Sequence, residues 1–286
     1  MKSLFCLVFF LMLSLQGFNQ TITGKVYTAS NGIPMEYVSI GVIDTPVGTI
    51  TDEKGHFTLD VRNISKKAVL RFSMIGYKSQ TYTIEQLSNN VNLIKLEVEP
   101  VQLQEVVIKP SGKYRKIGAL SYTRHGGLCG WGGTDFGKGH EIGIKIDLGN
   151  RPVRLKSLHL HLDKQSFDSS IFRLHIRNIE NDLPKNELLN RNILITISKE
   201  SGWNDVDLRK YNVVLTGNIA LSLEWIKVTG VNENKLRRMN GSDQYMAVIL
   251  FSIKRNQGCT YTRWGSEAKW YRTEDQSPCF YLTIEE

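Results

Sequence analysis

The sequence predicts an all-β fold in which a seven-stranded β-sandwich is followed by a larger, jelly-roll-like β-sandwich. Short segments that alternate apolar and polar residues recur along the chain, separated by turn residues such as Gly, Asn and Asp. No stretch sustains the periodicity of an amphipathic helix. The composition, with 41% hydrophobic and 22% charged residues among 286, is typical of globular proteins and excludes collagen-like, disordered and multi-span membrane classes.

The first twenty residues resemble an export signal. Met1-Lys2-Ser3 supplies one basic residue, and the run from Leu4 to Leu15 is almost wholly apolar. This pattern is typical of a secretory signal peptide, and the run is shorter than the ~20 residues that span a bilayer. We therefore expect residues 1–20 to be removed and the protein to be exported, to the periplasm or to the outer membrane or cell surface. No transmembrane segment is expected after cleavage.

Three cysteines follow the signal, at Cys129, Cys259 and Cys279. An exported protein can form disulfides, but three cysteines cannot all pair within one chain. One bridge with a free thiol and three buried thiols both remain compatible with the sequence. No CxxC pair occurs, which excludes a zinc ribbon.

Residues 21–99 are predicted to form the first sandwich. The turn Asp52-Glu53-Lys54-Gly55 places glycine where a positive φ is needed, and the strand after it puts Phe57, Leu59 and Val61 on one face. We expect small antiparallel sheets, with strands at 21–27, 37–43, 48–51, 56–61, 69–74, 77–84 and 91–98.

Spaced motifs in this region resemble a known family. The motifs are Gly24-Lys25-Val26, Gly32-Ile33-Pro34, Val38-Ser39-Ile40, Gly48-Thr49-Ile50-Thr51-Asp52, Gly55-His56-Phe57 and Ile75-Gly76-Tyr77. In this order they resemble the carboxypeptidase regulatory-like domain, which implies a transthyretin-like (prealbumin-like) sandwich with an accessory, non-catalytic role. In Bacteroidota-type proteins this domain often opens TonB-dependent receptors. We do not expect such a receptor, because the residues that follow are too few for a plug and a large barrel.

Residues 100–125 are predicted to be a linker, and residues 126–286 the second sandwich. Parts of this region, Trp203 with Asp207-Leu208 and the segment 221–226, resemble uncharacterised exported Bacteroidota proteins, which implies no known activity. About eight strands are expected, at 141–148, 153–162, 171–179, 192–198, 219–226, 245–253, 260–264 and 279–284.

Charge and tryptophan are concentrated in the second half of the chain. Residues 21–109 hold nine basic and nine acidic residues, whereas residues 110–286 hold 26 and 19, which is most of the formal net charge of +8. All five Trp also lie there. We therefore expect the second domain to make the contacts, with an envelope glycan or a protein as partner. Anionic lipopolysaccharide or a membrane surface is a further possibility, and nucleic acid is not expected, because the charge is modest.

Exposed aromatic residues could stack on sugar rings. The candidates are Trp264, Trp270 and Tyr271, in a loop-rich stretch, followed by Trp131. Trp203 and Trp225 are expected to fill the core, where aromatic side chains bury much apolar area.

Three histidines form the strongest metal pattern. His159 and His161 are two apart and face one side of a strand, and His175 lies on the strand expected to come next. Arg173 and Arg177 flank His175, and a cation is disfavoured beside them. We therefore favour a solvated polar sheet face and expect no metal or other cofactor.

The sequence carries no recognised catalytic motif. No His is followed by Glu three residues on, and Gly-x-Ser-x-Gly is absent. The segment 132–139 resembles a P-loop but lacks the final Ser/Thr and precedes a predicted strand, and Cys129 has His125 and Asp135 only as sequence neighbours. We predict a non-catalytic exported binding or structural protein of the bacterial envelope. A carbohydrate-binding module and a hydrolase with an unrecognised site are the alternatives.

Overall fold

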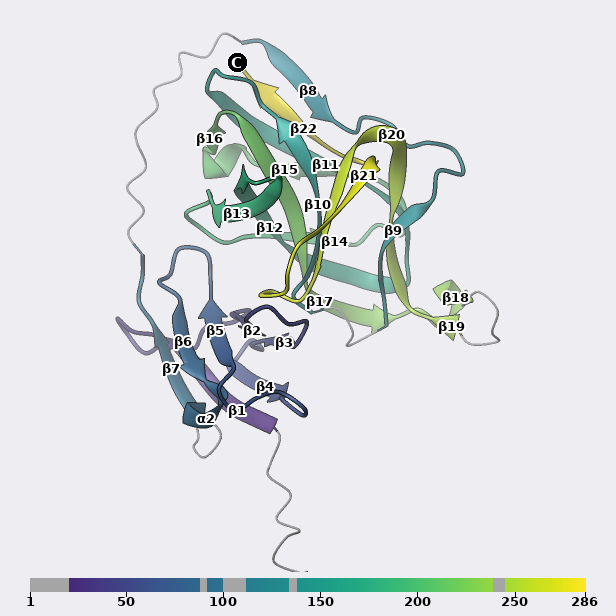
Figure 1. Ribbon diagram of the computed structural model, residues 1–286. Helices are drawn as coiled ribbons and strands as arrows, with labels where there is room; N and C mark the ends of the chain where they lie inside the picture. The colour runs from purple at the N-terminus through teal and green to yellow at the C-terminus, as the bar shows by residue number, and fades with distance from the viewer. Residues whose placement is uncertain (1–20, 88–91, 100–111, 134–137, 239–244) are drawn as a thin grey trace, which may run out of the picture.

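The computed structural model describes residues 21–87, 92–99, 112–133, 138–238 and 245–286, so the predicted signal peptide lies outside the described residues. Nearly all of the described secondary structure is β-strand, and it forms two successive β-sandwiches (Figure 1). The predicted all-β fold class is confirmed. Among the described residues, no helix is long and apolar enough to cross a membrane.

The first sandwich has seven strands in two sheets, as predicted. One sheet contains β4 (His56–Asp60), β1 (Thr21–Thr28) and β7 (Asn92–Leu96). The other contains β3 (Gly48–Ile50), β2 (Ser39–Val42), β5 (Val69–Ser73) and β6 (Gln80–Thr83), which leads into the short helix α2 (Ile84–Leu87). β7 runs parallel to β1, where we expected antiparallel pairing. Turn residues indicate only how consecutive strands are connected, and these two strands are distant in the chain.

Alternation along β4 builds part of the core of this sandwich. Phe57 and Leu59 are buried and pack in one cluster with Ile40 of the opposite sheet, as the sequence pattern predicts. Gly55, in the turn before β4, has a φ of +76°, and a Cβ there would lie 2.6 Å from the carbonyl oxygen of Val26. The turn therefore requires glycine.

The second sandwich has two layers, which we name after their central strands. The β11 layer contains β8 (Tyr114–Gly118), β22 (Phe280–Glu285), β11 (Val153–Gln165), β15 (Gly202–Asp207), β16 (Val214–Leu215) and β9 (Leu128–Gly132). The β12 layer contains β13 (Leu183–Glu187), β14 (Ile193–Ile197), β12 (Phe167–Glu180), β17 (Asn218–Val231), β10 (His140–Asp147) and β21 (Tyr271–Pro278). Smaller elements are η1 (Arg209–Tyr211), η2 (Glu233–Lys235), β18 (Arg237–Arg238) and β19 (Tyr245–Met246). The strand pairs of both layers are antiparallel, as a jelly-roll-like sandwich requires.

A single long strand, β20 (Val248–Trp264), belongs to both layers. Its first part pairs with β9 and β11, and its later part pairs with β10 and β21. We expected two strands here, at 245–253 and 260–264, and the turn-forming residues Asn256 and Gly258 lie between them. Both residues do adopt positive φ, but they accompany a register shift, and the chain continues as one strand.

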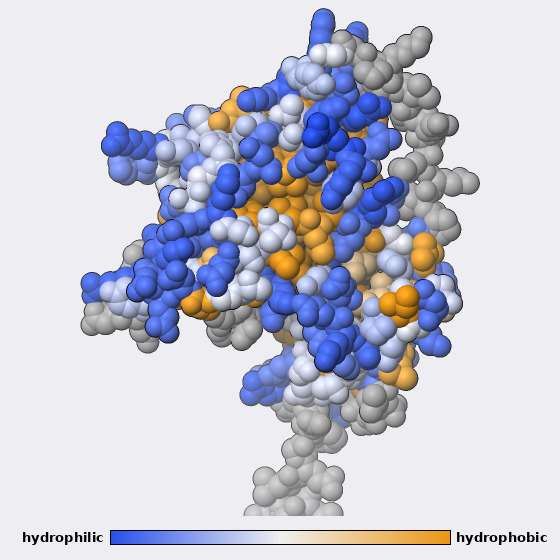
Figure 2. All heavy atoms as spheres, turned by 180° about the vertical axis from the view of Figure 1, so that it is seen from behind, coloured by the Kyte–Doolittle hydropathy of each residue, from blue (hydrophilic) through white to orange (hydrophobic). Residues whose placement is uncertain are grey.

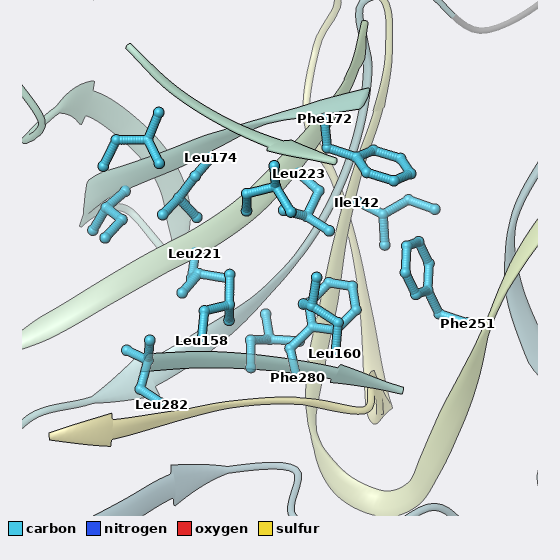
Figure 3. Packing of buried hydrophobic residues seen from close by; sticks show 14 of the residues in the cluster. Ile142, Leu158, Leu160, Phe172, Leu174, Leu221, Leu223, Phe251, Phe280 and Leu282 are labelled. Atoms are coloured by element: carbon cyan, nitrogen blue, oxygen red, sulfur yellow. The ribbon is translucent and has the colours of Figure 1, made fainter. Parts of the chain in front are cut away.

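The core of the second sandwich lies between its two layers. Leu158 and Leu160 of β11 and Phe280 of β22 point from one layer toward Phe172 and Leu223 of the other (Figure 3). These side chains have no solvent exposure. Seen from behind, the surface is largely hydrophilic, and the largest visible group of hydrophobic side chains lies in a hollow near its middle (Figure 2).

Ordered structure of the second sandwich begins before residue 126. β8, at Tyr114–Gly118, lies inside the predicted linker 100–125 and pairs along β22, for example Lys116 with Thr283. This strand is polar and mostly exposed, so the hydrophobic pattern gives no sign of it.

The two sandwiches pack directly against each other. Tyr37 and Ile50 of the first form an apolar cluster with Ile226 of the second. The amide of Asp44 donates to the carbonyl oxygen of Glu267, at 3.0 Å, which joins the first sandwich to the loop between β20 and β21 (Figure 1). The first sandwich therefore covers part of the second.

Candidate functional site

Strand β11 presents its histidines on the outer face of the β11 layer. Leu158, Leu160 and Leu162 are fully buried, whereas His159 and His161 between them remain partly exposed. This alternation confirms the predicted sidedness of the strand. The outer face of this layer is therefore where polar and aromatic residues from neighbouring strands can gather.

Five ring side chains form a continuous row on this face. His161 lies opposite Trp203 of β15, and His159 lies opposite Tyr281 of β22, because these strands pair directly with β11. The ring centroids are 4.6 Å apart for Tyr122 and His161, 5.0 Å for His161 and Trp203, 5.1 Å for Trp203 and Tyr281, and 4.1 Å for Tyr281 and His159. We call these five residues the aromatic strip. Tyr122 is half exposed, and the other four rings are partly exposed.

Polar groups hold the two imidazoles of the strip. His159 Nδ1 lies 2.5 Å from the Asp205 carboxylate, and its Nε2 lies 2.9 Å from the Thr283 hydroxyl. His161 Nδ1 lies 2.9 Å from the Ser252 hydroxyl. Since both imidazoles are fixed on β11 and by hydrogen bonds, this part of the strip is preorganised.

Burial keeps one imidazole of the strip uncharged at neutral pH. Desolvation lowers the pKa of His161 below its ordinary value, and the nearby Asp163 carboxylate opposes this effect only in part. The strip therefore has an uncharged imidazole beside Trp203 at pH 7.

The aromatic residues that the sequence singled out do not form this strip. Trp131 is 4% exposed and packs against Phe172 and Phe251 in the core, so its ring cannot reach a surface ligand. Trp264 and Tyr271 are 48% and 59% exposed and lie on β20 and β21.

The remaining tryptophans divide between the core and the two outer faces. Trp225 fills the core, as expected, but Trp203 lies on the outer face. The alternation around Trp203 in β15 is the signal that could have placed it there. Trp270 packs over the guanidinium groups of Arg177 and Arg263, with carbon-to-centroid distances of 5.5 and 4.8 Å.

The structure does not bring His159, His161 and His175 together. His175 lies on β12, which pairs with β17 and β14, so it belongs to the other layer from His159 and His161. The expectation that β12 would lie next to β11 is therefore wrong, because chain neighbours need not pair when each strand has partners from distant segments. Within the described residues, no group of three or more His, Cys, Asp or Glu could hold a metal ion.

The outer face of the β12 layer is a buried network of charges, not the solvated face that we expected. Arg173, on β12, is 1% exposed, and its Nη1 lies 2.7 Å from the Glu224 carboxylate of β17. The same nitrogen donates to the hydroxyl of Ser39 of the first sandwich at 2.7 Å, and Nη2 donates to the Tyr37 carbonyl oxygen. The first sandwich therefore completes the coordination of this guanidinium.

A second buried carboxylate accepts from two further arginines. The Glu141 side chain, on β10, has no solvent exposure and accepts from Arg177 Nη1 at 2.7 Å and from Arg263 Nε at 2.8 Å. The Ser222 hydroxyl donates to it as well, at 2.7 Å. Although burial alone would raise the pKa of Glu141, the arginines lower it well below its ordinary value.

His175 bridges the carboxylates of Glu187 and Glu224. Its Nδ1 lies 2.6 Å from Glu187 and its Nε2 lies 3.0 Å from Glu224. Desolvation and Arg177 oppose protonation, but the surrounding carboxylates outweigh them and raise the pKa of His175. Arg173 and His175 in turn bring the pKa of Glu224 to about 2, against the opposing effect of burial.

This charge network does not form an acid–base pair for catalysis. Glu141 and Glu224 are 0% and 1% exposed, so no substrate can reach them as the protein stands. Both carboxylates are also held ionised by their partners, whereas a general acid needs a raised pKa. The network therefore acts as a structural contact between the layers and the two domains.

The other sequence candidates do not assemble either. Burial raises the pKa of Cys129 to about 12, which makes it a poor nucleophile, and Asp135 lies outside the described residues. Strand β10 follows the P-loop-like segment 132–139, where a P-loop needs a helix. In the described chain, Cys129, Cys259 and Cys279 are all free thiols.

A groove of about 530 Å³ lies where the two domains meet. Ile50 and Phe57 of the first sandwich and Ile226 of the second contribute to its lining. Glu53 and Lys227, also in the lining, form an ion pair at 2.5 Å across the boundary. These two charges of the groove thus serve the contact between the domains.

Comparison with known proteins places the first sandwich in a family. The sequence model of the CarboxypepD_reg-like domain matches residues 22–108. A search of curated proteins found no significant match. Among solved structures, the chain is similar to the clostridial cysteine protease Cwp84 after propeptide cleavage, with 11% identity and a TM-score of 0.38 over 94% of this chain and 71% of that one.

Further structural similarities are equally distant. The cysteine protease and lectin-like domains of Cwp84, a surface layer associated protein of Clostridium difficile, give 11% identity and a TM-score of 0.39, over 94% of this chain and 63% of that one. The structure of infectious bursal disease virus Gx strain gives 10% identity and a TM-score of 0.25, over 93% and 74%. Scores this low carry no inference about function. The first sandwich of this chain, with its seven strands and its matching residues 22–108, is a CarboxypepD_reg-like domain.

Proposed function

We propose that this chain is a non-catalytic binding protein of the bacterial envelope and that it binds a glycan on the aromatic strip. The observation that supports this proposal is the row of five contacting rings on the outer face of the β11 layer. Sugar rings have apolar C–H faces that stack on aromatic side chains, and several rings in a row can contact successive sugars. Tyr and Trp suit this role because they combine an apolar ring with a polar group.

Polar side chains beside the rings support the same ligand class. The Asp205 carboxylate, which is exposed, and the Thr283 hydroxyl both lie within hydrogen-bond distance of His159. Carboxylates and hydroxyls are the groups that exchange hydrogen bonds with sugar hydroxyls. An aromatic surface bordered by such groups provides both stacking and orientation.

Further features support the class and location of the protein. The basic start and apolar run of residues 1–20 favour export to the periplasm or cell surface. The resemblance of parts of the second domain to exported Bacteroidota proteins favours a cell of that type. The CarboxypepD_reg-like domain is an accessory module, and the buried carboxylates of the β12 layer are enclosed, which favours binding over hydrolysis.

Binding of residues 21–286 to a glycan array, followed by calorimetry with the best ligand, tests the proposal. Trp203→Ala should weaken binding about fivefold or more, since the loss of one stacked ring is worth roughly 1–3 kcal/mol. Trp264→Ala is the matched control, because it removes an exposed tryptophan that lies outside the strip. Thermal unfolding of both variants checks that the fold is retained.

The proposal fails if Trp203→Ala binds as tightly as the unmodified chain. If Trp264→Ala lost binding and Trp203→Ala did not, the binding site would lie at the end of β20, near the aromatic candidates that the sequence indicated. Absence of binding to every glycan on the array would leave a structural role for the domain pair and would reject glycan binding.

A further inference from the structure

We propose that the glycan bound by the aromatic strip is acidic, and that its carboxylates face Lys116 and Lys254. This inference rests on the proposed function and specifies its ligand. It comes from two lysines on the outer face of the β11 layer, Lys116 and Lys254, which lie on the opposite side of the strip from Asp205.

Two lysines border the strip on the side of β22 and β20. Lys116, on β8, is exposed and lies opposite Thr283, and its Nζ is 5.6 Å from the centroid of the Tyr281 ring. Lys254, on β20, lies two residues beyond Ser252, and its Nζ donates to the Ser121 hydroxyl at 3.2 Å, next to Tyr122. The two ammonium groups thus lie near different rings of the strip.

Neither lysine is neutralised within the part of the chain that the structure describes. Lys116 contacts the Tyr281 ring and Lys254 contacts Ser121, and neither forms an ion pair there. Lys156, on the same layer, provides the contrast, since Glu285 pairs with it at 3.2 Å. Lys116 and Lys254 therefore remain available for an anionic ligand.

Asp205 lies on the other side, while Asp163 lies on β11 itself, near His161. Strand β15, which carries Asp205, pairs along one edge of β11, while β22 pairs along the opposite edge, with β8 beyond it. Lys116 and Lys254 therefore lie on the opposite side of the strip from Asp205. A sugar chain lying on it would turn its hydroxyls toward Asp205 and its carboxylates toward the lysines, since like charges repel.

The inference can be tested with uronate polysaccharides and their uncharged counterparts. Calorimetry would compare residues 21–286 binding to polygalacturonate, alginate and hyaluronate, each beside its carboxyl-reduced form. We expect at least one acidic form to bind about tenfold more tightly than its reduced form, which corresponds to roughly 1.4 kcal/mol. The double variant Lys116→Gln/Lys254→Gln should bring the ratio close to one, while Trp203→Ala should weaken binding to both forms.

A second double variant separates a local from a general effect of charge. Lys185→Gln/Lys269→Gln removes the same charge from exposed positions outside the strip and should leave the preference intact. Equal loss of preference in this control would overturn the inference. Equal, Trp203-dependent binding to acidic and reduced forms would also overturn it while leaving the proposed function in place. If no Trp203-dependent binding occurs to these polysaccharides or on the glycan array, both proposals fail.

Discussion

The two outer faces of the second sandwich place similar residue types in opposite environments. On β11, the outward His159 and His161 are partly exposed and belong to the aromatic strip. On β12, Arg173 and His175 also point away from the core, yet they are 1% and 6% exposed. Ser39 and Tyr37 of the first sandwich cap Arg173, and β13 supplies Glu187 to His175. Alternation along a strand determines which side chains point away from the core, and tertiary packing determines whether those side chains are exposed to solvent.

This difference determines what each face can do. Charges on a covered face must be paired with each other, because an unpaired buried ion costs several kcal/mol. The covered face therefore contributes to the stability of the domain pair. Side chains on the open face can keep part of their bonding capacity for a ligand, and substitutions there should affect binding more than folding.

The largest expected effect is on the covered face. Arg173→Ala leaves the buried Glu224 without its guanidinium partner and should lower the free energy of unfolding by about 3–5 kcal/mol. Urea denaturation measures the change. Arg209→Ala, which breaks an exposed pair with Asp207, should change it by less than about 0.5 kcal/mol. Similar losses in both variants would mean that the network is not the stabilising contact described above.

The second-largest expected effect is a loss of folding stability at acidic pH, because protonation weakens the same charge network. The pKa of Glu224 falls to about 2 in the folded protein, from an ordinary value of 4.5, so its contribution is present above pH 4.5 and is lost as the pH falls toward 2. The shift corresponds to about 3 kcal/mol. Glu224→Gln should flatten the stability profile over this range. Chemical denaturation at successive pH values provides the readout.

A smaller effect is expected where the first sandwich contacts the network. Ser39→Ala removes a hydroxyl that bonds to both Arg173 and Glu224, and it should lower the free energy of unfolding by roughly 1.5–3 kcal/mol. Thr283→Ala, on the open face, loses a contact to His159 that water can replace, and should cost less than about 1 kcal/mol. A larger loss of stability in Thr283→Ala than in Ser39→Ala would contradict the distinction between the two faces.

The smallest effect concerns the pH dependence of binding. Because burial lowers the pKa of His161, its ring is less protonated between pH 8 and pH 6.5 than an ordinary imidazole. Affinity for a glycan should therefore change by less than about twofold across this interval, which corresponds to roughly 0.4 kcal/mol. Calorimetry at several pH values measures this, and a steep change near pH 7 would show that the imidazole is charged when the ligand is bound.

Local patterns predicted all seven strands of the first sandwich, but in the second they missed several, among them β9, β13, β15 and β21. The buried Phe57 and Leu59 and the sidedness of His159 and His161 follow from alternation within single strands. The aromatic strip depends on β15 and β22 pairing with opposite edges of β11, although these strands are far apart in the chain. Sequence spacing contains no information on such a register.

The charge network could not be predicted from the sequence for a related reason. Arg173, His175 and Arg177 have the composition of a solvated face, and only the docking of Ser39 and the positions of Glu141 and Glu224 make them interior. The candidates Trp264 and Tyr271 were correctly expected to be exposed, but exposure alone does not bring rings together. Contact between two domains cannot be derived from the pattern of either one.

The continuity of β20 has a mechanical consequence. Because this strand pairs with β9 and β11 in one layer and with β10 and β21 in the other, the layers share a covalent backbone as well as a core. Sliding one layer past the other would have to break hydrogen bonds along both halves of the strand together. A pull applied at the aromatic strip would pass from β11 through its hydrogen bonds to β20, and then along the backbone of β20 to the layer that holds the first domain.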